Sequence, residues 1–208
     1  ADRGSRDPIT ARLFIAILDL RDHAFSETEM DASGASLRTL FDQAYRPIWE
    51  SLARARMGHE TIVTLLRKHE ADLTAGTIVR RSDTQVTVTE SIDSAVRDTF
   101  WSFVLSSTLA LHDVQKVTRL CGLEIGFLFQ PQVRFESGGN ELQASGAVDL
   151  ARYLERVRTN WSQDLVDLRN KIEHKSWTLP RFQYLPDGAG GVEFSIPKVQ
   201  TVDLNAYT

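Results

Sequence analysis

The chain has 208 residues, of which 42% are hydrophobic and 25% are charged, and its formal net charge is -4. This length suits one well-buried core, and the acidic balance disfavours a general polyanion-binding surface while leaving room for a local basic patch. The single cysteine, Cys121, excludes an internal disulfide and an all-cysteine metal cluster, which fits a reducing cytoplasm.

No membrane contact is expected from the sequence. The most apolar run, Phe100 to Leu111, has about 12 residues, against the roughly 20 that a membrane-spanning helix needs. Residues 1–7 are small or charged and do not resemble a signal peptide. We therefore predict a soluble protein.

Two helices are expected in the first third of the chain. Asp7-Pro8 is a typical helix start, and an apolar face follows it to about His23. After a polar loop over residues 26–36, a long helix is predicted from Leu37 to Gly76, with the glycine as its C-cap. Pro47 lies inside this helix and should kink or restart it, because proline removes a backbone donor.

The middle of the chain predicts a short strand and then a central helix. Residues 85–89 alternate β-branched and polar side chains, as a strand or extended link does. Ser91 can cap a helix whose apolar positions continue to Phe129, where Pro131 stops it. The pattern fits one long helix or two with a break around His112-Asp113. Its middle is apolar on several faces, which predicts a central position in a bundle.

Residues 135–145 contain Ser-Gly-Gly-Asn and predict a loop. A long amphipathic helix is then expected from about Ala147 to Lys175. Its apolar residues recur every three or four positions, the period of a helix with one buried face, at Leu150, Leu154, Val157, Trp161, Leu165, Leu168 and Ile172.

Beyond Pro180 the sequence predicts a small β-hairpin. Residues 181–185 and 192–196 favour strands, and the glycine-rich stretch between them favours the turn. The strand at 85–89 is a possible further partner of this hairpin. The predicted fold is therefore mainly α: a bundle of about four to five helices with long central helices and a C-terminal hairpin at about 181–197. We expect a single domain over residues 1–208.

Several kinds of site are disfavoured. None of the five histidines has a glutamate three residues before it, and no two histidines are four apart, so helical di-metal and zinc motifs are absent from the sequence. There is no Gly-x-Ser-x-Gly elbow, and the glycines at 188–191 lie between two strands rather than before a helix. No metal or cofactor is predicted.

The strongest chemical signal is the heptapeptide from Leu168 to His174, near the end of the amphipathic helix. Arg169 can hold a phosphate bidentately, and His174 can move a proton near neutral pH. Asn170 would orient the substrate or the imidazole. The three are predicted catalytic residues.

Arg158 and Lys171 are predicted substrate-binding residues. Arg158 lies about three helical turns before Arg169, on nearly the same face, and the two arginines would form a phosphate-binding track. A structural alternative is an ordinary ion pair between Arg169 and Glu173, spaced i, i+4, with the neighbouring basic residues complementing the helix dipole.

Helix geometry separates the two ends of the motif. On a regular helix Arg169 and His174 lie about 140° apart, so one ideal helix cannot close both on a single substrate atom. Either the helix distorts near its end or a second copy of the protein supplies the missing half.

The sequence Arg169-Asn170, followed by three residues and His174, resembles the signature of the HEPN superfamily. The resemblance covers about residues 90–180 and implies a helical bundle that forms a dimer, with two motifs lining one cleft. Toxins of the HEPN and nucleotidyltransferase pairs carry a tyrosine two positions after the histidine, where this chain has Ser176.

The resemblance implies a metal-independent endoribonuclease, in defence or toxin–antitoxin biology, with RNA as substrate and an antitoxin or other protein as a further partner. His174 would activate the ribose 2′-hydroxyl, and Arg169 would stabilise charge on the phosphate. The alternative is a catalytically inactive HEPN-like interaction or nucleotide-sensing module.

Overall fold

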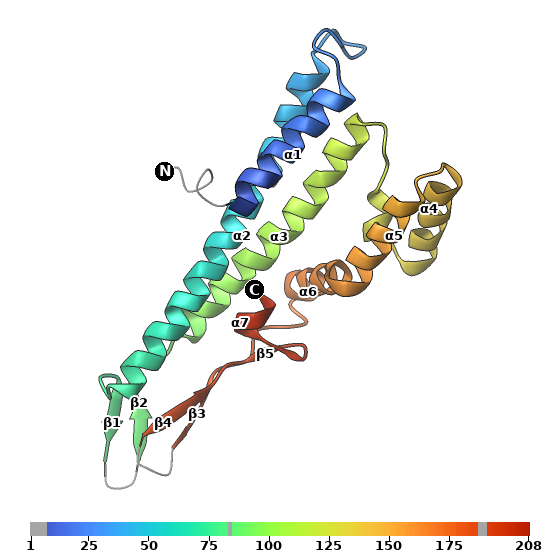
Figure 1. The fold of residues 1–208 in the computed structure, drawn as a ribbon. Coiled ribbons are helices and arrows are strands. Elements are labelled where there is room, and N and C mark those ends of the chain that lie inside the picture. The colour runs from blue at the N-terminus through green and yellow to red at the C-terminus, as the bar shows by residue number, and fades with distance from the viewer. Residues whose placement is uncertain (1–7, 83–84, 187–190) are drawn as a thin grey trace. The chain divides into compact units, whose positions relative to one another are not determined.

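The computed structural model describes residues 8–82, 85–186 and 191–208. It is mainly helical, and its two longest helices are α2 (Leu37–Thr74) and α3 (Asp93–Leu120) (Figure 1). The predicted mainly α fold, with long helices and a small C-terminal β-hairpin, is confirmed. None of the helices in these ranges is long and apolar enough to cross a membrane.

The other elements are shorter than α2 and α3. The remaining helical segments are α1 (Pro8–Ala24), the 3-10 turn η1 (Gly126–Phe129), α4 (Gln132–Ala144), α5 (Val148–Val157), the π-helical turn η2 (Arg158–Ser162), α6 (Gln163–Glu173) and α7 (Leu204–Tyr207). Antiparallel pairing joins β1 (Val79–Arg81) to β2 (Val86–Val88), β3 (Gln183–Pro186) to β4 (Val192–Ser195), and β5 (Lys198–Val199) to β6 (Val202–Asp203).

The chain divides into two compact units. The first consists of Ala1–Glu50 and Ala110–Leu154, and the second of Ser51–Leu109 and Glu155–Thr208. Both α2 and α3 contribute to each unit. One domain over residues 1–208 stays a prediction.

Helix α2 follows the predicted range closely. It continues through Pro47 without restarting, because Tyr45 and Ile48 on either side of the proline are buried in an apolar core and offset the lost hydrogen bond. Gly76 adopts φ 71° just beyond the helix, as expected of a C-cap. Asp7, the predicted N-cap of the first helix, lies outside the described residues.

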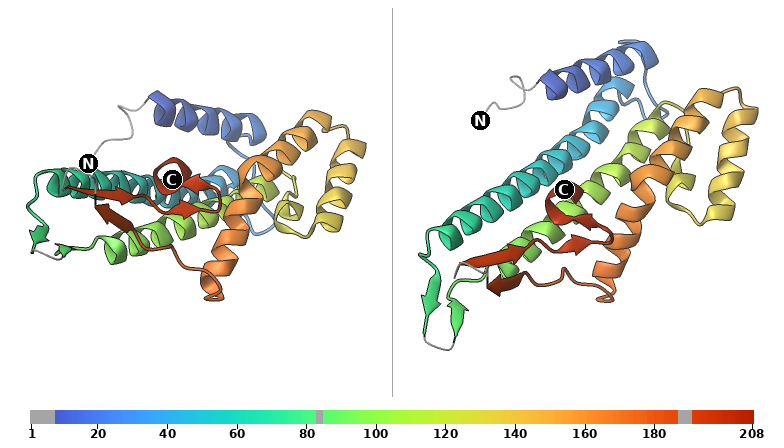
Figure 2. Two further views of the ribbon diagram at one scale, coloured as in Figure 1. Left: turned by 90° about the horizontal axis from the view of Figure 1, so that it is seen from below. Right: turned by 60° about the horizontal axis from the view of Figure 1, so that its bottom comes forward.

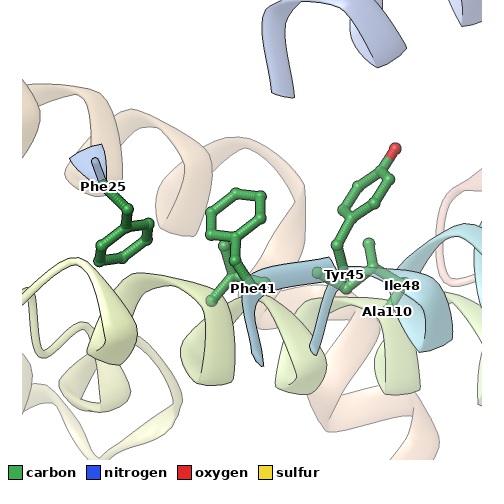
Figure 3. Packing of buried hydrophobic residues seen from close by; sticks show 6 residues of the cluster. Phe25, Phe41, Tyr45, Ile48 and Ala110 are labelled. Carbon is green, nitrogen blue, oxygen red and sulfur yellow. The ribbon is translucent and has the colours of Figure 1, made fainter. Parts of the chain in front are cut away.

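The first unit has an apolar core of aromatic and aliphatic side chains. Phe25 packs edge-on against Phe41, with ring centroids 6.1 Å apart (Figure 3). The cluster is completed by Tyr45, Ile48, Ala110 and Val117. These residues pack the loop after α1 against successive turns of α2 and α3.

Helix α3 ends earlier than predicted. It is continuous through His112-Asp113, so the possible break there does not occur, and it stops at Leu120 rather than near Phe129. Gly122 has φ 74°, and the N–H of Leu123 donates to the carbonyl of Thr118 at 2.8 Å. This is a Schellman cap, in which a glycine without a Cβ ends the helix.

The predicted loop at residues 135–145 is wrong, because α4 occupies most of it. Phe135 and Leu142 of α4 are buried against Ala151 and Leu154 of α5, and Figure 2 shows these helices side by side. Gly138 is needed for packing, since a Cβ there would overlap the Phe127 side chain, with Cδ1 only 2.6 Å away.

In the second unit, α2 and α3 approach closely at Gly58, where an added Cβ would lie 3.2 Å from Cβ of Phe103. Phe100 is fully buried and contacts the rings of Trp177 and Tyr207, with centroids 6.1 and 5.9 Å away. The strand predicted at 85–89 pairs with β1, which corrects the suggested pairing with the C-terminal hairpin. The glycine turn of that hairpin, at 187–190, lies outside the described residues.

Adjacent glycines of α4 give a matched test of how this helix packs against Phe127. Gly138→Ala should lower the free energy of unfolding by about 1–3 kcal/mol, because the new methyl group displaces Phe127. Gly139 has no heavy atom within 4 Å of an added Cβ, so Gly139→Ala should raise it by about 0.5–1 kcal/mol through helix propensity alone. Urea unfolding measures both, and equal effects would contradict the described packing.

Candidate functional site

The candidate site lies on a helical run that changes its winding once. Helices α5 and α6 are joined without interruption by the π turn η2 at Arg158–Ser162. A π turn holds more residues per turn than an α-helix. The helix therefore distorts, as one alternative required, but before the motif rather than near the end of the helix.

The π turn changes which side chains face the core. Leu154, Val157, Leu165 and Leu168 are buried as predicted, but Trp161 is 47% exposed. Arg158 and Ser162 are buried instead, at 7% and 2%. The sequence pattern assumed a uniform period, and an extra residue in one turn rotates the following side chains by about 100°.

Arg158 is consequently a buried residue. Burial lowers the pKa of its guanidinium, and the nearby carboxylate of Asp167 acts in the opposite direction. The exposed track of Arg158 and Arg169 on one regular face is not formed, because the π turn lies between them. A role for Arg158 in substrate binding stays a prediction.

The guanidinium of Arg169 is held by its own helix. Its Nη1 donates to Oδ1 of Asn170 at 3.1 Å, and its Nη2 lies 2.6 Å from Oε1 of Glu173. The side chains of Arg169 and Glu173 are 34% and 43% exposed. The i, i+4 ion pair of the structural alternative is therefore present, and such pairs contribute well under about 1 kcal/mol.

His174 is the C-cap of α6, and its side chain is exposed. Lys175 follows in the left-handed region at φ 54°, while the N–H of Ser176 donates to the carbonyl of Lys171 at 2.9 Å. This Schellman cap uses lysine where glycine is preferred, at a cost of about 1 kcal/mol. The cap fixes His174 at the exposed end of the helix, with Lys171 and Lys175 also exposed.

A buried histidine in the second unit was missed by the sequence argument. His69 of α2 is 3% exposed, and its Nε2 lies 2.8 Å from the hydroxyl of Tyr184 in β3. Burial raises the pKa of Tyr184 to about 12, with a further contribution from Asp93, so this hydroxyl keeps its proton. The Nε2 of a neutral His69 can then accept a hydrogen bond from this hydroxyl. The pair joins positions 115 residues apart, and no local pattern reveals it.

Two hollows lie elsewhere on the described surface. One of about 790 Å³ is lined by the end of α2, β1 and β4, and one of about 500 Å³ by α3, η1 and α4. Neither includes a residue of the motif. Among the described residues, no three His, Cys, Asp or Glu side chains cluster as metal ligands.

Comparison with known proteins identifies no relative. A scan against protein-family models finds no match, and searches of curated proteins and of solved structures find no similar protein. The HEPN resemblance therefore depends on Arg169, Asn170 and His174 and on the helix that carries them.

His69 should make stability depend on pH. Burial, the largest effect, lowers its pKa below 6.5 and Lys68 acts in the same direction, against smaller opposing effects of Asp72, Asp93 and Glu90. As the pH falls, His69 of the unfolded chain therefore binds a proton at a higher pH than His69 of the folded chain does. The free energy of unfolding should be highest above pH 6.5 and should fall as the pH drops toward the folded pKa.

Unfolding of the wild type and of His69→Phe between pH 7.5 and 5.5 measures this effect. The advantage of the wild type should shrink as the pH falls, since phenylalanine does not titrate. Tyr184→Phe retains the buried imidazole, so its free energy of unfolding should change with pH as steeply as that of the wild type. Parallel curves for the wild type and His69→Phe would contradict the assignment.

Proposed function

We propose that the chain is a metal-independent endoribonuclease of the HEPN type, acting as a homodimer whose two motifs form one composite site in the cytoplasm. The observation that supports this best is the fork of Arg169. Two guanidinium nitrogens each hold one oxygen, from Asn170 and from Glu173. Two oxygens of a phosphodiester fit the same bidentate arrangement.

Glu173 is a replaceable occupant of this fork. Its ion pair with Arg169 is partly exposed and intrahelical, so solvent screens it and its loss costs little. A phosphate brings the same negative charge and a better bidentate geometry. RNA binding would therefore exchange the Glu173 carboxylate for the scissile phosphate, while Asn170 stays beside it.

The proposed reaction is a transesterification within RNA. His174 takes the proton of the ribose 2′-hydroxyl, whose oxygen attacks the phosphorus, and Arg169 stabilises the charge on the non-bridging oxygens. The bond from phosphorus to the 5′-oxygen breaks, that oxygen takes a proton from water, and His174 returns its proton to the solvent. The products are a 2′,3′-cyclic phosphate and a free 5′-hydroxyl, without a metal. Because Arg169 and His174 point to different sides of one helix, the second copy would supply whichever of the two cannot reach the same phosphate.

One observation favours a second candidate function. The same ion pair neutralises Arg169 within its own helix, as it would in a catalytically inactive interaction or nucleotide-sensing module. Such a module would bind an antitoxin or another protein without cutting RNA. Cleavage assays separate the two.

The decisive assay incubates the purified protein with labelled single-stranded RNA in excess EDTA. The wild type should leave cyclic phosphate ends, whereas Arg169→Ala and His174→Ala should reduce the rate at least about 100-fold, as loss of a general base or a charge stabiliser does. Arg46→Ala breaks another i, i+4 pair, of 2.9 Å with Glu50, and should cleave normally.

Thermal unfolding accompanies the assay. Arg169→Ala should change stability by less than about 1 kcal/mol, because its ion pair is exposed. A large loss would mean that Arg169 is structural. Equal cleavage by the wild type and His174→Ala would place the activity elsewhere, and no cleavage by a dimeric wild type on varied RNAs would favour the inactive module.

Replacing Glu173 tests the exchange directly. Glu173→Gln keeps the shape but removes the competing charge, so the Kd for RNA should fall about two- to fivefold, the equivalent of about 0.5–1 kcal/mol. The Kd is measured by fluorescence anisotropy in the His174→Ala background, which prevents cleavage of the RNA during the measurement. Glu50→Gln is the matched control. Unchanged or weaker binding by the Glu173 variant would contradict the exchange.

A further inference from the structure

Four helices of the described chain, α2, α3, α4 and α6, end in the same cap. In each cap one residue has a positive φ and its N–H donates to the carbonyl three residues back, while the next N–H donates to the carbonyl five residues back. The first three caps have glycine at the left-handed position, at Gly76, Gly122 and Gly146. The cap of α6 has Lys175 there, at φ 54°. The exception therefore lies directly after His174.

Lysine is strained at this position, because in the left-handed region its Cβ crowds the following carbonyl oxygen. Lys175 is exposed, and no carboxylate among the described residues forms an ion pair with it, so no packing or pairing there offsets the strain. A cation that only complements the helix dipole fits an unstrained position of the last turn, where Lys171 already lies. Strain retained at an exposed residue beside a candidate site indicates a function for its side chain.

Lys175 extends the positive charge of the motif past His174. Side chains inside a helix lean back toward its N-terminus, so Arg169 and Lys171 carry their charges over earlier turns. Lys175 is the first residue beyond the C-cap, and its Cα lies about 3.8 Å from that of His174. A compact ammonium on a flexible four-carbon stem suits a phosphate next to the ribose on which His174 acts.

We propose that Lys175 binds the RNA phosphate on the 5′ side of the ribose whose 2′-hydroxyl His174 activates. Arg169 of the composite site holds the scissile phosphate on the 3′ side of the same ribose, so the two cations fix this nucleotide from both sides. This inference deepens the proposed function and rests on it, because the contact has a role only if RNA is the substrate.

RNA binding by the full chain tests the charge. Lys175→Gly and Lys175→Gln both remove the ammonium, but only glycine relieves the strain. In the His174→Ala background, each should raise the Kd for single-stranded RNA about fivefold at about 0.1 M salt and lower the slope of log Kd against log salt by about 0.7, the value of one phosphate contact. Lys175→Arg should retain the Kd and the slope. An unchanged Kd and slope in Lys175→Gln would overturn the proposal.

Thermal unfolding tests whether the lysine is retained at the expense of stability. Lys175→Gly should raise the Tm, because glycine has no Cβ to crowd the carbonyl, whereas Lys175→Gln should not. Gln200→Gly is the matched control, since Gln200 is exposed and has φ 57° in the turn between β5 and β6. It should raise the Tm and leave the Kd for RNA unchanged. A lower Tm for Lys175→Gly, or an equal rise in Kd for Gln200→Gly, would overturn the proposal.

A neutral phosphate locates the contact. An RNA that the wild type cuts is 2′-O-methylated at every position except the cleaved one, which fixes the reacting ribose. A methylphosphonate on the 5′ side of that ribose should lower kcat/KM of the wild type as much as Lys175→Gln does, and should lower that of Lys175→Gln no further. Equal losses in the wild type and the variant would place Lys175 away from this phosphate and overturn the proposal.

The contact and the nuclease can fail separately. A wild type that binds and cuts RNA, but whose Kd and kcat/KM do not respond to Lys175→Gln, would refute the contact alone. A wild type that neither binds nor cuts RNA would refute the nuclease and the contact together.

Discussion

The π turn at Arg158–Ser162 is the constraint on which the candidate site depends. It joins α5 to α6 without a loop, yet rotates every later side chain relative to the earlier ones. Arg158 and Ser162 are buried together with Leu165 and Leu168, whereas Trp161 is exposed. The orientation of Arg169 and His174 follows from where these leucines are anchored, since both are on the same short helix.

Arg169 links this local geometry to chemistry. Its guanidinium already holds two oxygens, but both come from exposed residues of its own helix. The ground state of the isolated chain is therefore electrostatically satisfied, and a substrate has to compete with Glu173 rather than fill a vacant charge.

Glycines show how a single residue type carries different information. Gly76 and Gly122 end helices with positive φ, which a sequence pattern can identify, and the first was predicted. Gly138 is inside α4 because Phe127 occupies the space of its Cβ. Since glycine pairs are typical of loops, the sequence favoured a loop there, and only the tertiary contact reveals a helix. Pro47 gives the opposite case, because burial of its neighbours overrides a local preference.

The amino-acid sequence alone determined the mainly α class, the extent of α2, the hairpin of β3 and β4, and the ion pair of Arg169 with Glu173. These features depend on interactions between residues close in the chain, whose period or spacing is visible in the sequence. The tertiary structure decided the end of α3, the helix α4, the π turn, the burial of Arg158 and the contact of His69 with Tyr184. Each of these depends on which side chains from distant segments fill the same space, and no local pattern records that.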